Sequence, residues 1–243
     1  MEKLKTFLYE NGLPFPSDLV DDIIDLKALS NLKRVPSILI IDGAPGTGKT
    51  TLGVHIMDVV NGKDTELVGD VPQVAMGGDS LIKKAEQCHK LGLKAILFDE
   101  ADLDKRGSLT KYNSNLFGFF REYRSLGILI IICIQNVSWL DNRIWELGAV
   151  DGLIHLYNPQ EGYTDYTVYD LENLSYLLYR MDKMGMQRRK AYSIVKGYKR
   201  GHFLPLPNIR QAQLDSLSNQ QKATSRRKRT KAVKNIPIST SKL

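Results

Sequence analysis

Cysteine and histidine are scarce in this chain, and neither is arranged as a metal or redox site would require. The two cysteines stand alone, Cys88 in a helical pattern and Cys133 in an apolar run. Such settings are typical of buried thiols rather than of a disulfide or a metal-binding pair. The four histidines follow no ligand spacing and so argue against a zinc site; they are His55, His89, His155 and His202.

Long hydrophobic runs are also missing. The longest, Ile128 to Ile134, is far too short to cross a bilayer, and Met1 to Lys5 lack the apolar core of a signal peptide. The hydrophobic content of 42% and the charged content of 25% are ordinary for a globular protein. A chain of 243 residues can bury one full-sized core. We therefore expect a globular protein that stays in the cytoplasm.

Acidic residues are absent from residues 222–243, which hold eight of the 34 basic residues. Subtracting these eight leaves 26 basic against 27 acidic residues, so the net charge of +7 belongs to this tail. The tail has too little apolar content to pack, and we expect it to be disordered. Its basic cluster suits DNA phosphates, with a solvated tail or a basic address signal as alternatives; the candidate DNA-binding residues are Arg226, Arg227, Lys228, Arg229 and Lys231.

What the sequence does contain in full is the pattern G-x-x-x-x-G-K-[ST], from Gly43 to Thr50. An apolar run, Ile38 to Ile41, precedes it, and an amphipathic stretch, Leu52 to Val60, follows it. A strand therefore delivers this loop and a helix carries it away, which is the setting of a phosphate-binding loop (P-loop). The glycines let backbone N–H groups wrap around a polyphosphate, and the helix N-terminus adds a partial positive charge.

The residues of the loop have distinct expected roles toward ATP. Lys49 would reach the β- and γ-phosphates, Thr50 would hold Mg²⁺, and Thr51 would lie near the α-phosphate. The predicted nucleotide-binding residues are Gly43, Ala44, Pro45, Gly46, Thr47, Gly48, Lys49, Thr50 and Thr51.

A second apolar run, Ala95 to Phe98, ends in Asp99 and Glu100. This pattern places acids at the carboxyl edge of a parallel strand, beside the γ-phosphate. Asp99 is expected to bind Mg²⁺ through water, and Glu100 to be the base that orients the attacking water. The plainer alternative for Glu100 is a solvated carboxylate at the end of a strand.

Strands and helices alternate along the chain, which predicts an α/β fold: a P-loop NTPase of the RecA/FtsK-like type with a mainly parallel sheet flanked by helices. Four parts are expected: an N-terminal helical extension (1–36), a P-loop ATPase core (37–157), a C-terminal extension packed on the core (158–221) and the basic tail (222–243). Further elements are predicted as a weak strand at Glu66 to Val68, helices at Leu109 to Ser125 and Leu171 to Met184, and a strand at Arg189 to Gly197.

These stretches resemble the FtsK/HerA superfamily of P-loop ATPases, which move DNA. The resemblance covers about Ser37 to Tyr157, with a weaker echo at Gly201 to Pro207. It rests on the P-loop, on Ile96 to Glu100, on two arginines before Gly127 with a buried strand ending in Gln135, and on Leu140 to Leu147 leading into Asp151.

The resemblance implies that catalysis involves more than the P-loop. Gln135 would contact the γ-phosphate or its water, and Arg121 or Arg124 would act in a neighbouring subunit, with Arg106 and Arg143 as rival arginines. The catalytic set so implied is Lys49, Glu100, Arg121, Arg124 and Gln135.

The implied function is an ATPase that translocates double-stranded DNA, with ATP and Mg²⁺ at the subunit boundaries of a hexameric ring. In its compact size the chain is most similar to viral genome-packaging ATPases or to plasmid- or virus-encoded relatives. The partner would be a capsid or replication protein, and the location the host cytoplasm or the virion.

One alternative is an AAA+ replication protein or helicase loader, with Asn136 as its sensor; a helical lid bearing an arginine after Tyr157 would favour it. The other is an ATP-dependent assembly scaffold, against which Glu100 and Gln135 count.

The basic tail yields a direct prediction. If all eight basic residues contact phosphates, log affinity for DNA falls with log salt with a slope of roughly −7 from the tail alone. Removing residues 222–243 should therefore weaken DNA binding and flatten its salt dependence while basal ATP hydrolysis persists. Fluorescence anisotropy with labelled duplex across a salt series measures this, and an unchanged slope contradicts it.

Overall fold

The computed structural model describes residues 15–16, 18–25, 37–62, 73–76, 78–99, 117–121, 127–208, 210–217 and 219. The chain divides into two compact units, Met1–Leu206 and Pro207–Leu243. In the second unit, residues 210–217 are helical, and Gln211 Nε2 donates a 2.9 Å hydrogen bond to Asp215 Oδ1. Within the described ranges, every helix is too short or too polar to cross a membrane.

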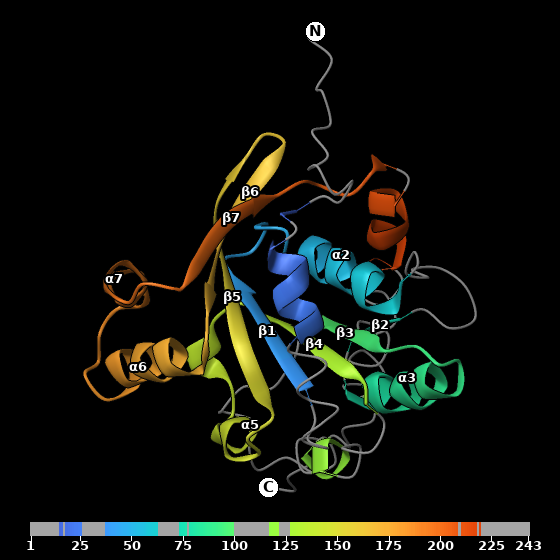
Figure 1. Ribbon diagram of the computed structural model, residues 1–243, viewed down its shortest axis with the longest axis horizontal. Helices are drawn as coiled ribbons and strands as arrows, with labels where there is room; N and C mark the ends of the chain where they lie inside the picture. Colours follow the sequence, from blue (N-terminus) through green and yellow to red (C-terminus); the bar gives the residue numbers. More distant parts are fainter. Residues whose placement is uncertain are drawn as a thin grey trace, which may run out of the picture. The chain divides into compact units, whose positions relative to one another are not determined.

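The first unit is built on a seven-stranded sheet in the order β2-β3-β4-β1-β5-β6-β7 (Figure 1). Neighbouring strands from β2 to β5 pair in parallel, whereas β6 pairs antiparallel with both β5 and β7. The prediction of an α/β fold with a mainly parallel sheet is confirmed. The strands are β1 Ser37–Gly43, β2 Val74–Met76, β3 Ala95–Asp99, β4 Leu129–Ile134, β5 Val150–Gln160, β6 Tyr163–Tyr169 and β7 Lys199–Phe203.

The three central strands β1, β3 and β4 are buried along their whole length. Their sequences are continuous apolar runs, as expected for parallel strands covered on both faces. Side chains alternate between the two faces of a strand, so Ile38, Ile40 and Asp42 share one face, while Leu39 and Ile41 share the other. The two faces of β1 therefore pack against different helices.

The helices of this unit cover both faces of the sheet. They are α2 Lys49–Asn61, α3 Gly78–Lys90, the 3₁₀ turn η3 Val137–Trp139, α5 Asn142–Glu146, α6 Leu171–Asp182 and α7 Arg188–Ile194. Helix α2 packs so tightly on β3 that a Cβ on Gly53 would lie 2.6 Å from Leu97 Cδ1. The face of Ile38 and Ile40 is covered instead by α3, α5 and α6, whose buried side chains form one core cluster with it.

Several connections fix the ends of these elements. Helix α2 ends at Gly62, whose φ of 66° is the left-handed conformation that suits glycine. Residues 18–25 form a helix joined to β7 through Asp22, which accepts hydrogen bonds from Tyr198 Oη at 2.9 Å and Lys199 Nζ at 2.6 Å. Both cysteines are buried thiols, as predicted, and burial raises the pKa of Cys88 to about 11.

The C-terminal part of the first unit contains one wrong prediction. Residues Arg189 to Gly197 were expected to form a strand, but Arg188–Ile194 is helix α7 and the strand that follows is β7. The buried side chains here, Ala191 and Val195, are four residues apart, which is the spacing of a helix and not of a strand. Helix α6 is confirmed at Leu171–Asp182.

Three further predictions concern the boundary after residue 157, one helix and one short strand. The expected boundary between residues 157 and 158 falls inside β5, and β6 and β7 extend the core sheet itself. Of the helix predicted from Leu109 to Ser125, residues 117–121 are helical. The remainder of that helix lies outside the described residues. The predicted strand from Glu66 to Val68 also lies outside them.

Candidate nucleotide-binding site

The loop between β1 and α2 closes on itself through short-range hydrogen bonds. The backbone N–H and the hydroxyl of Thr47 both donate to the carbonyl oxygen of Ala44, at 3.3 Å and 2.9 Å. Gly43 has no room for a side chain, because a Cβ there would lie 2.6 Å from Thr47 Oγ1 and 2.9 Å from the Leu156 carbonyl oxygen. Gly48 has a φ of 80°, so glycine is favoured where the loop turns into the helix. The loop therefore has the tight shape that the sequence predicts.

Lys49 is the first residue of α2, and its side chain reaches back across the loop. Its ammonium donates to the carbonyl oxygens of Gly43 at 3.0 Å and Ala44 at 2.9 Å. Burial lowers the pKa of Lys49, Arg188 lowers it further, and the negative charges of Asp99 and Asp42 act in the opposite direction. The ammonium thus lies inside the loop, where the β- and γ-phosphates of a nucleotide would be bound.

Thr50 and Asp99 come together although they lie in different motifs. Thr50 Oγ1 donates a 2.9 Å hydrogen bond to Asp99 Oδ2, and Asp99 is buried at the carboxyl end of β3. A hydroxyl and a carboxylate beside a phosphate-binding loop are the protein ligands that Mg²⁺ takes when substrate phosphates and water complete its octahedron. Among the described residues no cluster of three or more histidine, cysteine or acidic side chains could hold a metal. The hydroxyl of Thr50 and the carboxylate of Asp99 fit Mg²⁺ bound jointly with a nucleotide.

The strand order also fixes where Gln135 lies. Strand β4 runs between β1 and β3, and Gln135 follows its last residue, Ile134, with its side chain exposed. Gln135 therefore stands at the same sheet edge as the P-loop and Asp99. Glu100 follows Asp99 directly and lies outside the described residues, so its role stays a prediction.

The candidate trans-acting arginines have different surroundings. Arg121 is exposed and lines a cavity of about 390 Å³ together with Arg143 and Glu146 of α5. Helix α5 leads into the first residue of β5, so this cavity lies toward the amino-terminal edge of the parallel strands, away from the P-loop. Arg143 is held by Asp141 at 2.9 Å, and its guanidinium lies 3.9 Å from the centre of the Phe117 ring. Arg106, Arg124 and the candidate DNA-binding residues of the tail lie outside the described residues.

A buried carboxylate immediately before the loop was not recognised from the sequence. Asp42 is fully buried and binds side chains from β5 and α7. His155 Nδ1 lies 2.7 Å from Asp42 Oδ1, while Tyr192 Oη and an Arg188 amine donate to Asp42 Oδ2 at 2.6 Å and 3.2 Å. The Val137 backbone N–H donates to the same oxygen at 3.1 Å. Four groups from three separate segments thus converge on one carboxylate.

The charge of this cluster is set by competing effects. Burial pushes the pKa of Asp42 upward, but the hydrogen bond and charge of His155, the charge of Arg188 and the Tyr192 hydroxyl outweigh it, so the pKa lies below its ordinary value. Burial and the neighbouring carboxylate raise the pKa of Tyr192 well above its usual range. The cluster is therefore an ionised carboxylate surrounded by donors.

One signal in the sequence points to this cluster in retrospect. An aspartate that ends an apolar strand must find donors once it is buried. His155 faces Asp42 directly in the parallel register of β1 and β5, but the two residues are 113 positions apart in the chain. The missing information was the pairing of these two strands, which no local pattern supplies.

The sheet, the loop and the Thr50–Asp99 contact together define the class of this protein. A strand that delivers a P-loop, with β4 between it and the acidic strand β3, forms a P-loop NTPase fold. That class is the level at which the fold and the site identify the protein.

Comparisons with known proteins give distant structural similarity alone. No family model and no curated protein matches the chain. Among solved structures it is similar to the N-terminal domain of zonular occludens toxin from Neisseria meningitidis, with 19% identity over 56% of this chain and 84% of that one and a TM-score of 0.37. A HORMA:CdnC:Trip13 complex from E. coli MS115-1 gives 12% identity, coverage of 74% and 72%, and a TM-score of 0.41. A KaiC-like protein from Pyrococcus horikoshii OT3 is 11% identical, with coverage of 56% of this chain and 78% of that one and a TM-score of 0.32. These TM-scores are low, and the class rests on the strand order and the loop.

The Asp42 cluster predicts an effect on stability. Tyr192→Phe removes one of the four donors and leaves a buried carboxylate less well compensated, so the free energy of unfolding should fall by about 1–3 kcal/mol. Urea unfolding measures this change. The exposed Tyr179 provides a matched control, because Tyr179→Phe should change stability by less than about 0.5 kcal/mol. Equal effects of the two substitutions would contradict the role given to Tyr192.

Proposed function

We propose that this protein is an ATPase that binds Mg·ATP in the loop from Gly43 to Thr51. The observation that supports this best is the 2.9 Å contact between Thr50 Oγ1 and Asp99 Oδ2. It brings the two halves of a magnesium site together, within reach of a lysine that already lies inside the loop. Backbone N–H groups of the loop would hold the β-phosphate, and Lys49 would span the β- and γ-phosphates.

Hydrolysis requires a group that positions water opposite the leaving phosphate. Glu100 follows Asp99 at the carboxyl end of β3, and Gln135 follows the adjacent strand β4. In this proposal Glu100 orients the water and Gln135 contacts the γ-phosphate. Bound Mg²⁺ would neutralise charge that develops on the phosphate oxygens.

We further propose that hydrolysis drives movement of double-stranded DNA through an oligomeric ring, as in a genome-packaging motor. The support is the resemblance to the FtsK/HerA superfamily and the concentration of positive charge in residues 222–243. In a ring, an arginine from a neighbouring subunit stabilises the charge of the transition state and couples turnover to assembly. Arg121 is exposed and suits this role, whereas Arg143 is paired with Asp141. Arg124 remains the other candidate.

One observation favours the second candidate, an AAA+ replication protein or helicase loader. Two helices, α6 and α7, follow Tyr157, and α7 begins with Arg188, whose guanidinium binds Asp42 just before the P-loop. An arginine supplied by the same chain beside the loop is what that alternative predicts. Along the chain, however, α6 and α7 lie between β6 and β7, so they are part of the core sheet's connections and not a separate lid that follows the sheet.

The catalytic base is tested by Glu100→Gln. Removing the carboxylate should lower kcat by about 10²- to 10⁴-fold while ATP still binds, because the P-loop is unchanged. Steady-state phosphate release and titration with a fluorescent ATP analogue measure the two quantities. The control is Glu172→Gln, an exposed acid at the start of α6. Unchanged turnover in Glu100→Gln would remove Glu100 from the mechanism.

The coupling to DNA is tested by titrating duplex and single-stranded DNA into a steady-state ATPase assay of the full chain. The translocase proposal predicts stimulation by duplex of any sequence, exceeding that by single strands. Stimulation by single-stranded DNA alone would favour the replication protein. Turnover indifferent to both forms would contradict a DNA motor while leaving the ATPase proposal standing.

A further inference from the structure

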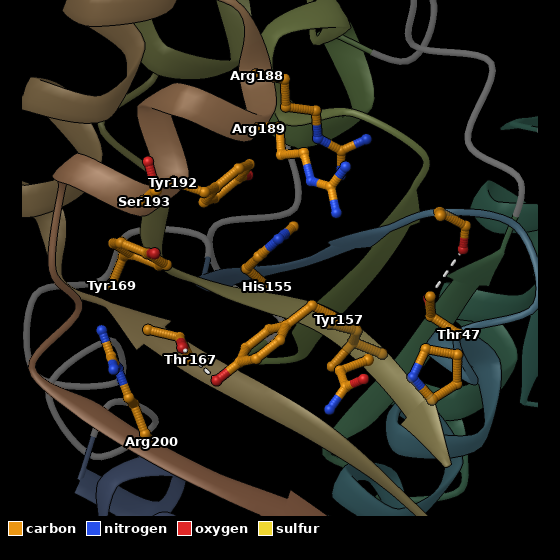
Figure 2. Close-up of a pocket in the computed structure, with 14 residues that line it drawn as sticks. Thr47, His155, Tyr157, Thr167, Tyr169, Arg188, Arg189, Tyr192, Ser193 and Arg200 are labelled. Atoms are coloured by element: carbon orange, nitrogen blue, oxygen red, sulfur yellow. Dashed lines mark hydrogen bonds between the residues drawn. The ribbon is translucent and has the colours of Figure 1, made fainter.

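A cavity of about 610 Å³ lies beside the P-loop, and nothing in the proposed ATPase mechanism uses it. Its walls come from the outer side of the loop, from the carboxyl-terminal part of β5, from β6 and β7, and from α7 (Figure 2). Its volume is within the roughly 300–1,000 Å³ that is usual for small-molecule pockets.

This cavity is distinct from the place where the P-loop would hold phosphates. Its lining includes Ala44 and Thr47 of the loop but neither Lys49, Thr50 nor Asp99. It lies over the sheet face that carries Asp42, whereas α2, which supplies Lys49 and Thr50, covers the opposite face at Leu97. The segment from Ala44 to Thr47 is thus a wall shared by two separate spaces.

The charge of the lining calls for an anion. Among the described residues, it contains three arginines, Arg188, Arg189 and Arg200, and no acidic residue. Arg188 is held by Asp42, but in the part of the chain that the structure describes neither Arg189 nor Arg200 forms an ion pair with a carboxylate. Guanidinium groups suit phosphate oxygens, because they donate two parallel hydrogen bonds and keep their charge. Figure 2 shows Arg188 and Arg189 reaching from α7 toward the loop, with Arg200 on the opposite wall.

The same cavity carries an aromatic surface. The rings of Tyr192 and His155 stack with their centres 3.6 Å apart, and Tyr157 continues the row at 5.9 Å from His155. Tyr157 is half-buried and accepts a 3.4 Å hydrogen bond from Thr167 Oγ1. A planar ring that enters the cavity would extend this row, and base–aromatic stacking is a strong and sequence-tolerant interaction. Asn158 and Ser193 add amide and hydroxyl groups to the lining.

Part of this lining is also held in place before any ligand arrives. Asp42 fixes Arg188, Tyr192 and His155 at once, and Tyr157 and Arg200 stand on strands of the core sheet. Side chains supported in this way lose little freedom on binding, which favours affinity.

We propose that this cavity binds a nucleotide unit, that is, a phosphate ester bearing a planar base, separately from the nucleotide in the P-loop. The phosphate is bound by an exposed guanidinium group of the lining, that of Arg189 or Arg200, and the base stacks on Tyr157. The unit comes either from a free nucleotide or from a strand of nucleic acid. This inference goes beyond the proposed ATPase and does not depend on it.

The experiment uses the full chain with Lys49→Ala, so that binding in the P-loop is impaired and the cavity is measured on its own. The probe is AMP, followed by isothermal titration calorimetry, because AMP lacks the β-phosphate that a P-loop grips. We expect one AMP per chain. Adding Arg189→Ala and Arg200→Ala should weaken binding by about tenfold or more. Both side chains are exposed, so the unfolding midpoint should not change.

The matched control is Lys190→Ala in the same Lys49→Ala background. Lys190 is exposed and neighbours Arg189 on α7 but does not line the cavity, so its removal should leave the affinity for AMP unchanged. Arg189→Lys with Arg200→Lys should give intermediate affinity, because lysine keeps the charge but not the paired donors.

A second arm distinguishes the two sources of the nucleotide unit. A fluorescein-labelled single-stranded oligodeoxythymidine is titrated into the same proteins and followed by anisotropy. Arginine-dependent binding of AMP identifies a free nucleotide, and arginine-dependent binding of the oligonucleotide without AMP identifies a strand. Absence of both, indifference to the arginines, or inorganic phosphate binding as tightly as AMP would overturn the proposal. ATP turnover by the parent chain is a separate readout, so failure here and failure of the ATPase proposal remain distinguishable.

Discussion

The buried carboxylate of Asp42 is the interaction on which the arrangement around the P-loop depends. An ionised carboxylate without partners would be very costly inside a sheet, and removing one partner of such a group is more damaging than replacing the whole set. Asp42 therefore makes its four partners obligatory. Because these partners come from η3, β5 and α7, the carboxylate joins the P-loop strand to the antiparallel part of the sheet and to the helix that covers it. The loop begins one residue later, at Gly43, so the contacts of Asp42 fix the position of its first residue.

The sheet order explains why this region can hold a phosphate-binding loop and an acid at one edge. Strand β4 separates β1 from β3, and the gap is crossed by Thr50 reaching from α2 to Asp99. Gly53 allows α2 to lie close enough to Leu97 for that reach. A larger residue at position 53 would therefore change the distance between Thr50 and Asp99, although it contacts neither of them.

The elements that could be predicted from the sequence are those marked by a pattern within a short stretch of the chain. The P-loop, the strands β1, β3 and β4 and helix α6 are marked by continuous patterns within short windows, and they are where the sequence places them. The region around α7 was taken for a strand because the spacing of Ala191 and Val195 is outweighed by neighbouring polar and aromatic residues. The placement of β6 and β7 in the core sheet and the meeting of Asp42 with His155 depend on strand pairing over long separations, which composition and periodicity do not encode.

In the part of the chain that the structure describes, the sheet is open and β2 and β7 are its edge strands. Exposed strand edges invite other chains to add strands, and proteins protect them with short strands and charged side chains. Here β2 has three residues, and β7 carries the exposed side chains of Arg200 and His202 along its five. Uncontrolled edge-to-edge polymerisation is disfavoured at both ends. For this sheet, contacts through side-chain surfaces, which can separate and re-form, are easier to make than the addition of a strand that would make it continuous with another.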